Sequence, residues 1–294
     1  MTSTSAPAEP GTTRPARRGG NRPSLRKLTG RTIMLLVLVT VAVLTVVPLL
    51  WMVFGSLKTR SEVYSLDLLP QEPTLDNYRY VFTEVPFLRY MFNSFFVATV
   101  ITVLALWFHS MAAYALSRLR FPGRDTLFLL IFSTFLVSLP VILVPLFILV
   151  RELNMLDSYA GLIVPAIFNA FGIFLLRQFY LGLPRDLEEA AIIDGAGYWR
   201  VYWNIVLPLS RPILSALAVF FFLANWNSFL WPLTITSDPN LRMVQIGIAS
   251  FQQQYSGSQQ YILAASTIVA LPTMILFFIF QRQFVESIKT SGLK

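Results

Sequence analysis

Side chains that could carry chemistry are few in this chain, and the most distinctive group lies in one segment. Cysteine is absent and His109 is the only histidine, which excludes a disulfide framework, a thiolate metal site and a cysteine nucleophile. With one histidine, no metal site built on imidazole is expected. Carboxylates instead cluster between Glu188 and Pro208, where the chain reads EEAAIIDGAGYWRVYWNIVLP. Without a histidine partner, these acidic groups are not expected to form a catalytic centre.

Helix signals divide this segment into two short helices joined by a turn. Asp186, with Glu189 three residues on, resembles a capping box and is expected to cap the first helix. Gly195 suits the left-handed residue that follows a helix end. A second helix is expected from Tyr198 to Pro208, with aromatic residues at 198, 199, 202 and 203 at the level of the lipid headgroups. From these signals alone, the segment is either a docking surface for another protein or an amphipathic loop that seals the membrane surface.

The elements that must position this segment are predicted to be membrane helices, so the expected fold class is all-α. The chain has 294 residues, of which 55% are hydrophobic and 13% charged, and its mean hydropathy is +0.62. Six apolar runs without Asp, Glu, Lys or Arg are long enough for helices of about 20 residues, the length that crosses a bilayer core. The six predicted transmembrane helices span about 32–56, 91–116, 127–150, 159–176, 212–232 and 262–281.

The basic residues indicate how these spans are oriented. Residues 1–31 are rich in Ser, Thr, Pro and Arg and are predicted to be a disordered basic tail. The apolar run that follows is too long for a signal peptide, so residues 32–294 are expected to form one transmembrane domain. With the N-terminus inside, 17 of the 23 lysines and arginines fall in the tail, the inner loops and the C-terminal end, which predicts that both termini are cytoplasmic. The net charge of +8 therefore reflects topology in a lipid bilayer, and no nucleic acid partner is expected.

The segment at 188–208 also resembles a known motif. Its residues have the spacing of the EAA loop of ATP-binding-cassette importer permeases: Glu189-Ala190-Ala191, three residues, Gly195, nine residues, Ile205, one residue, and Leu207-Pro208. In that family the loop forms a cytoplasmic coupling helix between spans 4 and 5, which inserts into a groove on an ATPase subunit. The resemblance implies that Glu189 contacts the ATPase, that the two alanines allow close approach, and that Gly195 makes the turn. The implied coupling residues are Glu188, Glu189, Ala190, Ala191, Asp194, Gly195, Ile205, Leu207 and Pro208.

Motifs elsewhere are similar to those of the carbohydrate-uptake permeases of this family, of the maltose-permease type. They are Ser56-Leu57-Lys58, PTLDNY at 73–78, Ala112 to Ala115 with Phe121-Pro122-Gly123, Asn225-Trp226-Asn227, Trp231-Pro232, and the ending Gly292-Leu293-Lys294. The resemblance implies a permease subunit of a binding-protein-dependent sugar importer in the cell membrane of a prokaryote. Its implied partners are a second permease subunit, two ATP-binding-cassette ATPase subunits and an extracytoplasmic sugar-binding protein.

This chain is not expected to be an enzyme. It has no G-x-x-x-x-G-K-[ST] loop, so ATP and magnesium are expected on the partner ATPase, and no cofactor is expected on this chain. An ion-coupled secondary carrier is the alternative from another class, but such carriers usually need charged residues within the spans, which the six runs lack. An importer permease for another solute class, such as a glycerol-phosphate diester, a peptide or an amino acid, stays open.

Polar residues within the spans are candidates for the solute path. Asn groups beside indole rings suit a sugar, whose hydroxyls need hydrogen bonds and whose C–H face stacks on aromatic rings. The candidates are Asn169, Asn225, Trp226, Asn227 and Trp231. The alternative role for each asparagine is a hydrogen bond between packed helices.

Two further sets of residues are interpreted by position. The polar outer stretch Phe251, Gln252, Gln253, Gln254 and Tyr255 is similar in place to the loop that reaches into the binding protein, with a plain surface loop as the alternative. Within the spans, Pro140, Pro145 and Pro165 are expected to kink or loosen their helices. His109 is expected to make a structural hydrogen bond rather than to relay protons.

Overall fold

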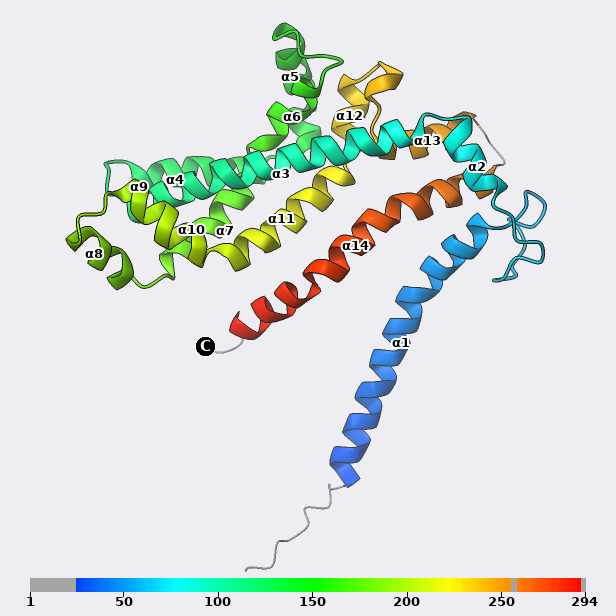
Figure 1. Cartoon of the computed structure of the whole chain (residues 1–294), viewed down its shortest axis with the longest axis horizontal. Coiled ribbons are helices and arrows are strands. Elements are labelled where there is room, and N and C mark those ends of the chain that lie inside the picture. Colours follow the sequence, from blue (N-terminus) through cyan, green and yellow to red (C-terminus); the bar gives the residue numbers. More distant parts are fainter. Residues whose placement is uncertain (1–24, 255–257, 292–294) are drawn as a thin grey trace, which may run out of the picture. The chain divides into compact units, whose positions relative to one another are not determined.

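The computed structural model describes residues 25–254 and 258–291, and the side chains of residues 32–251 and 258–280. Every regular element in these ranges is a helix, which confirms the all-α fold (Figure 1). The chain divides into two units, residues 1–49 and 50–294. The helix α1 (Leu25–Ser56) begins inside the stretch predicted to be tail, and residues 1–24 lie outside the described part of the chain.

Within the described residues, four helical segments are long and apolar enough to cross a membrane. They are Thr32–Ser56 of α1, α3 (Phe87–Arg118), Tyr159–Leu181, and Gln259–Phe280 of α14 (Gln259–Ser291). Two bent pairs raise the number to six if each pair counts as one span. The pairs are Arg124–Leu136 with Leu139–Glu152, bent by 102°, and Tyr198–Leu209 with Arg211–Trp226, bent by 74°.

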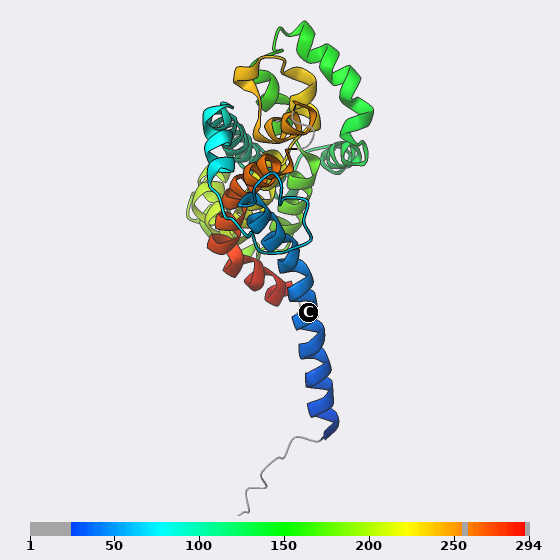
Figure 2. The same cartoon turned by 90° about the vertical axis from the view of Figure 1, so that its right-hand side faces the viewer.

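The helix α3 is the central element of the second unit. It contacts α6 (Tyr159–Ile167), α7 (Ala170–Leu181) and α11 (Arg211–Trp226), as Figures 1 and 2 show from two sides. It also contributes side chains to three buried clusters that follow one another along its length, through Phe87, Val97 and Ala105 among others. Because lipid is as apolar as these side chains, close packing rather than exclusion of water holds the membrane part of these clusters together.

The centre of this packing requires a glycine. A Cβ on Gly172 of α7 would lie 2.4 Å from Nδ1 of His109 in α3 and 2.6 Å from Cζ of Phe221 in α11. The three helices therefore meet where a side chain has no room. His109 is fully buried at this point, and its Nε2 accepts a hydrogen bond of 3.1 Å from the backbone N–H of Asn169. This bond confirms the structural role expected for the histidine.

The run predicted as the fourth span is broken between α6 and α7. Phe168 and Asn169 have extended backbone conformations, and Pro165 lies inside α6 two residues before its end. A proline lacks the N–H that an uninterrupted helix needs. Asn169 caps α7, because its Oδ1 accepts a hydrogen bond of 2.8 Å from the backbone N–H of Phe171. A cap and the bond to His109 thus satisfy backbone groups at the break, as membrane depth requires.

The runs predicted at 127–150 and 212–232 are also interrupted, so neither forms one straight helix. The first divides into α4 (Arg124–Ser133), the short η1 (Thr134–Leu136) and α5 (Leu139–Glu152). Pro140 lies in the first turn of α5, where a missing N–H costs nothing, and it marks a helix start instead of a kink. The second ends as α11 at Trp226 and resumes as α12 (Leu230–Ile235).

A buried lysine organises the loop after α1. The side chain of Lys58 is 2% exposed, its Nζ donates to Oγ of Ser65 at 3.3 Å, and it lies 5.2 Å from the ring centroid of Trp51. In α2 (Asp76–Thr83), Nδ2 of Asn77 donates to the backbone carbonyls of Ser56 and Lys58 at 2.8 Å each. The two sequence motifs at 56–58 and 73–78 therefore contact each other.

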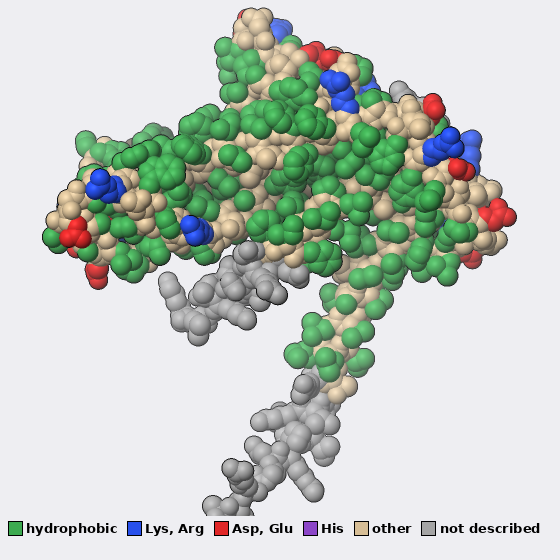
Figure 3. Space-filling view, in the orientation of Figure 1, with side chains coloured by type: hydrophobic (Ala, Val, Ile, Leu, Met, Phe, Trp, Pro, Cys, Tyr) green, Lys and Arg blue, Asp and Glu red, His purple; other side chains and the backbone are tan. Residues whose placement is uncertain are grey.

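The ends of α3 define two opposite ends of the second unit. The elements α8 (Asp186–Ile193) and α9 (Tyr198–Val201) lie near its C-terminal end, and α2 and α13 (Val244–Gln254) lie near its N-terminal end (Figure 1). Charged side chains on the visible face gather toward these ends and on the projection at the top that carries α5 and α12, and hydrophobic side chains cover most of the remaining surface (Figure 3). This distribution suits a unit whose middle lies in lipid.

Candidate functional site

The segment that follows α7 forms the predicted pair of short helices with a turn between them. The first is α8 (Asp186–Ile193), which has Arg185 at its N-cap and no side-chain cap. Asp186 is therefore the first helical residue and not the cap, which corrects the predicted capping box. The backbone N–H groups of Glu188 and Glu189 donate to the carbonyl of Arg185 at 2.9 Å. Acidic residues in this first turn also interact favourably with the positive end of the helix dipole.

The turn after α8 is a complete Schellman motif. Gly195 has φ +83°, the left-handed conformation that the sequence predicted for it. Its N–H donates to the carbonyl of Ile192 at 3.0 Å, and the N–H of Ala196 donates to the carbonyl of Ala191 at 2.9 Å. A Cβ at Gly195 would meet nothing within 4 Å, so only its backbone conformation selects glycine there.

The helix α8 has an exposed side and a side turned toward the rest of the unit. Glu189, Ala190 and Ile193 are exposed, Ile193 to 85%. Glu188 is half-buried, and Ala191 packs against the cluster around the C-terminal part of α3. The two alanines of the motif therefore lie on different sides of α8. Of the two glutamates, Glu189 lies on the exposed side. Asp194, just after the helix end, is also exposed.

The second helix continues through a π-helical turn. Its parts are α9 (Tyr198–Val201), the π-turn η2 (Tyr202–Val206) and α10 (Leu207–Leu209). Pro208 was expected to end the helix but lies inside α10, where the wider turn before it accommodates the missing N–H. Ile205 and Leu207 are half-buried against the same cluster as Ala191, whereas Pro208 is exposed.

The aromatic side chains of this helix divide between the surface and the core. Tyr198 and Trp199 are 61% and 59% exposed. Tyr202 is buried, and its hydroxyl lies 2.6 Å from Oγ of Ser110 in α3. Trp203 is half-buried and packs edge-on against Trp107. Of the four aromatic residues predicted to lie at the level of the lipid headgroups, only Tyr198 and Trp199 are therefore exposed.

An arginine joins α8 to the membrane helices. Arg118 is the last residue of α3, and its Nε lies 3.0 Å from Oε1 of Glu188, an ion pair in which the N–H is not aligned for a hydrogen bond. The Nη2 of Arg118 donates to the backbone carbonyl of Leu183 at 2.7 Å and to that of Tyr180. Burial raises the pKa of the Glu188 carboxyl, and the charges of Arg118 and Arg185 oppose that rise.

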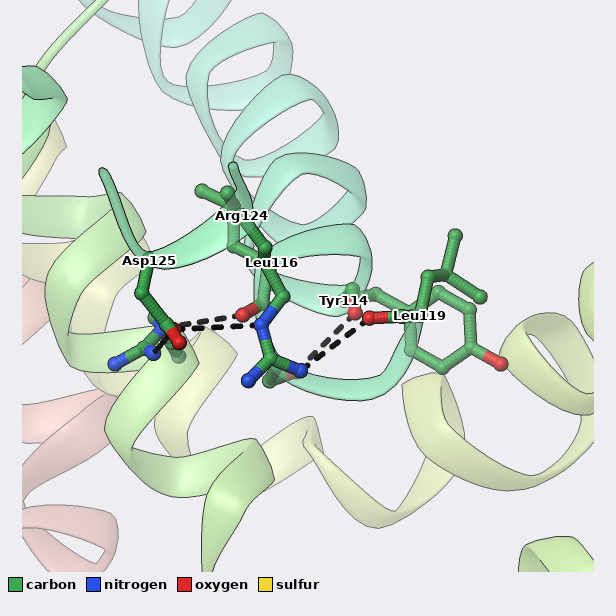
Figure 4. Close-up of polar contacts among 7 residues, drawn as sticks. Tyr114, Leu116, Leu119, Arg124 and Asp125 are labelled. Carbon is green, nitrogen blue, oxygen red and sulfur yellow. Dashed lines mark hydrogen bonds and ion pairs between the residues drawn. The ribbon is translucent and has the colours of Figure 1, made fainter. Parts of the chain in front are cut away.

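Two further arginines hold neighbouring helix ends. Arg124 at the start of α4 donates to the carbonyl of Leu119, and its Nε lies 3.3 Å from Oδ1 of Asp125 (Figure 4). Arg177 of α7 donates to the carbonyl of Leu116 at 3.2 Å and pairs with the same Asp125 oxygen at 3.1 Å. The sequence analysis predicted only a topological role for both arginines. The contacts of Arg177 could not be predicted, because they join residues 61 and 52 positions apart along the chain.

A cavity of about 530 Å³ lies at the break between α6 and α7. Asn169, Asn225 and Trp231 from the predicted solute path line it, together with Ser228, Thr134 and several aromatic rings. The indole of Trp231 is 5% exposed and donates to the carbonyl of Gly161 at 3.1 Å. Among the described residues that line this cavity, none is charged.

The other two residues predicted for the solute path lie elsewhere. The structure places Trp226 in the core, 1% exposed, with Nε1 donating to the carbonyl of Val269 at 3.3 Å. Asn227 follows the end of α11, and its Oδ1 accepts a hydrogen bond of 3.1 Å from Nε2 of Gln245. Neither lines the cavity.

The stretch predicted to contact a binding protein is mostly helical. Phe251 is 1% exposed and belongs to the buried cluster at the α2 end, so its ring is not available for a partner. Gln252, Gln253 and Gln254 form the last turn of α13, and Tyr255 lies outside the described residues.

Comparison with known proteins assigns the chain to a family. Residues 110–290 match the family described as binding-protein-dependent transport system inner membrane component, and the chain belongs to this family. It is therefore a membrane permease subunit and not an enzyme, as the resemblance implied.

Individual relatives support the same assignment. The chain is 36% identical over 259 residues to the arabinooligosaccharides transport system permease protein of Halalkalibacterium halodurans, covering 86% of this chain and 93% of the relative. It is 41% identical over 208 residues to the sn-glycerol-3-phosphate transport system permease protein of Yersinia enterocolitica, covering 70% and 74%. A chain of a bacterial ABC transporter involved in the import of the acidic polysaccharide alginate has the same fold, with a TM-score of 0.78, 23% identity, and 88% and 98% of the two chains covered.

Proposed function

We propose that this chain is the permease subunit of an ATP-driven importer for a neutral sugar. The relatives named above transport arabinooligosaccharides and sn-glycerol-3-phosphate, which are both polyhydroxylated solutes. The observation that carries the sugar assignment is the cavity at the α6–α7 break, which combines amide and hydroxyl groups with aromatic rings. Sugar hydroxyls need such hydrogen-bonding groups, and the C–H face of a sugar stacks on rings such as Trp231.

The absence of charge in the described lining of the cavity favours a neutral solute. A phosphate moved out of water needs a cation or several donors to offset its lost hydration, and the described residues that line this cavity include no lysine or arginine. Asn169 and Asn225 instead offer uncharged groups that can donate and accept. The proposed solute is therefore a mono- or oligosaccharide.

The exposed side of α8 is the proposed docking surface for an ATPase subunit. Glu189 and Ala190 lie on this side, and the rigid turn at Gly195 joins α8 to the helix that leads into α11. The helix α11 in turn lines the cavity through Phe220 and Asn225. One continuous stretch of chain thus connects the proposed ATPase surface with the proposed solute cavity. The proposed assembly contains a second permease subunit, two ATPase subunits that carry ATP and magnesium, and an extracytoplasmic binding protein, with α8 in the cytoplasm.

Solute uptake by whole cells tests this proposal. Uptake of ¹⁴C-labelled arabinotriose, maltotriose and glycerol 3-phosphate is compared in cells that carry the gene, lack it, or have it restored. We expect that deletion abolishes uptake of a labelled sugar, that restoration recovers it, and that depletion of ATP stops it while a protonophore acting alone does not. Uptake driven by an ion gradient without ATP would overturn the proposal.

Glycerol 3-phosphate is the second candidate solute, because the relative from Yersinia enterocolitica is the more similar of the two by identity. The same panel decides between them. If deletion abolishes uptake of glycerol 3-phosphate and leaves both sugars unaffected, the importer assignment stands and the sugar assignment is wrong.

A further inference from the structure

We infer that Arg118 is the positioning residue that fixes α8 on the permease body and passes its movement to α3 and α7. The inference rests on the proposed function, because it names the side chain through which a movement of an ATPase would reach the membrane helices. It assigns to Glu188 and Glu189, which are neighbours in sequence, two different partners: the permease itself and the ATPase.

The attachment of α8 to the rest of the unit is otherwise slight. None of its eight residues is buried, and only Glu188 and Ala191 are half-buried. Among the interactions of the described residues, Glu188 carries the only ion pair or hydrogen bond made by an α8 side chain. The contact with Arg118 is therefore the main polar link between the exposed helix and the membrane body.

The guanidinium of Arg118 joins three parts of the chain at once. It pairs with Glu188 in α8, and it donates to the carbonyl of Tyr180 near the end of α7 and to that of Leu183 in the connection to α8. Its side chain is 4% exposed and that of Glu188 is 12% exposed, so solvent screens the pair weakly. A planar group with several donors in fixed directions can hold three partners, which the single ammonium of lysine cannot match in geometry.

Arg177 provides a matched comparison in the same layer of the structure. Like Arg118 it donates to a backbone carbonyl near a helix end, that of Leu116 in α3, and it pairs with a carboxylate, that of Asp125. Its side chain is 12% exposed, and its guanidinium lies 3.9 Å from the ring centroid of Phe128. It makes no described contact with α8. Loss of Arg177 should therefore disturb the fold without loosening α8.

Four variants of the transporter, purified with its partner subunits and placed in nanodiscs or vesicles, test the inference. They are Arg118→Gln, Glu188→Gln, the double variant and Arg177→Gln. We expect the ATP hydrolysed per labelled arabinotriose transported to rise at least fivefold in Arg118→Gln and in Glu188→Gln. The double variant should be no worse than the worse single variant, because both changes break one link. Arg177→Gln should lower thermal stability and leave the ratio unchanged.

A second readout reports the position of α8 directly. Because the chain has no cysteine, Ile193→Cys places a single nitroxide label on the exposed side of α8. We expect the label to become more mobile in Arg118→Gln and Glu188→Gln and to be unchanged in Arg177→Gln. Glu188→Gln keeps the bonds of Arg118 to the two carbonyls, so it remains informative if Arg118→Gln fails to assemble. The label should be less mobile in Arg118→Lys than in Arg118→Gln.

The outcomes separate this inference from the proposed function. If the wild type shows no ATP-driven uptake of the sugar, the proposed function fails, and the label mobility still decides whether Arg118 fixes α8. Wild-type label mobility in both Arg118→Gln and Glu188→Gln would overturn the inference, and so would an unchanged ratio of ATP to sugar in a transporter that works.

Discussion

The turn after α8 depends on the backbone conformation of one residue. Gly195 has φ +83°, which costs an ordinary L-residue about 1 kcal/mol or more. Proline cannot adopt this angle and also lacks the N–H that bonds to Ile192. We expect Gly195→Pro to abolish transport-coupled ATPase activity with the protein still inserted in the membrane, as measured by ATP hydrolysis and immunoblotting. Gly197→Ala is the control, because Gly197 has φ −72° and open space around it. Normal coupling in Gly195→Pro would refute a docking role for α8.

A second glycine is limited by space instead of conformation. Gly172→Ala would bring a methyl group within 2.4 Å of His109 and 2.6 Å of Phe221. Overpacking of this kind typically costs about 1–3 kcal/mol, so we expect a lower melting temperature for the purified protein in detergent. Gly182→Ala, whose nearest neighbour would be at 3.4 Å, should melt as the wild type does. Equal melting temperatures for both variants would show that the three helices can separate at this point at little cost.

The ion pair of Glu188 should respond to pH. Burial raises the pKa of the Glu188 carboxyl above its usual range, the charges of Arg118 and Arg185 lower it, and that of Glu189 raises it. The folded protein therefore takes up a proton at a pH where the unfolded chain is still ionised, so the carboxylate that pairs with Arg118 is lost earlier than usual on acidification. We expect a label on Ile193→Cys to become mobile on acidification, at a higher pH than that at which an exposed glutamate takes up its proton. Glu188→Gln should remove this transition, and Glu189→Gln should keep it.

At the scale of elements, composition predicted where helices lie but not where they break. The run 127–150 has no charge, and a bent pair of helices satisfies that pattern as well as one straight helix does. Pro140 was expected to kink or loosen its helix, and the bend lies directly before α5, which has Pro140 in its first turn. The turn at Gly195 could be predicted because the left-handed conformation after a helix end favours glycine. The pair of Arg118 and Glu188 could not, because it joins residues 70 positions apart and depends on how α3 and α8 pack.

The break between α6 and α7 places its cap beside the cavity. Asn169→Ala removes the Oδ1 that accepts from Phe171, and loss of such a cap costs about 1 kcal/mol. We expect this variant and Asn225→Ala to raise the KM for sugar uptake several-fold, measured with the labelled sugar in cells. Asn227→Ala is the matched control, since Asn227 lies outside the cavity. If Asn227→Ala has the same effect as Asn225→Ala, the cavity is not the solute site.

At the scale of the whole molecule, the predicted orientation can be tested with single cysteines in a chain that has none. Leu66, in the loop after α1, is 91% exposed, and Ile193 of α8 is 85% exposed. The distribution of basic residues predicts that α8 is cytoplasmic and this loop is outside. We expect a membrane-impermeant maleimide to label Leu66→Cys in intact cells and Ile193→Cys only after permeabilisation. The reverse pattern would invert the topology and exclude an ATPase at α8.

The bend of 74° before α11 has a mechanical consequence for this arrangement. Ser210 at the corner is buried and bonds back to Val206, so the corner is stiff. Tyr202, in the arm before it, is held against Ser110 of α3. The helix before the bend and α11 are thus joined at a stiff corner and held at Tyr202. In such a lever, a push along the first helix moves α11 sideways. A small shift of α8 would thus reach Asn225 as a sideways swing of the cavity wall.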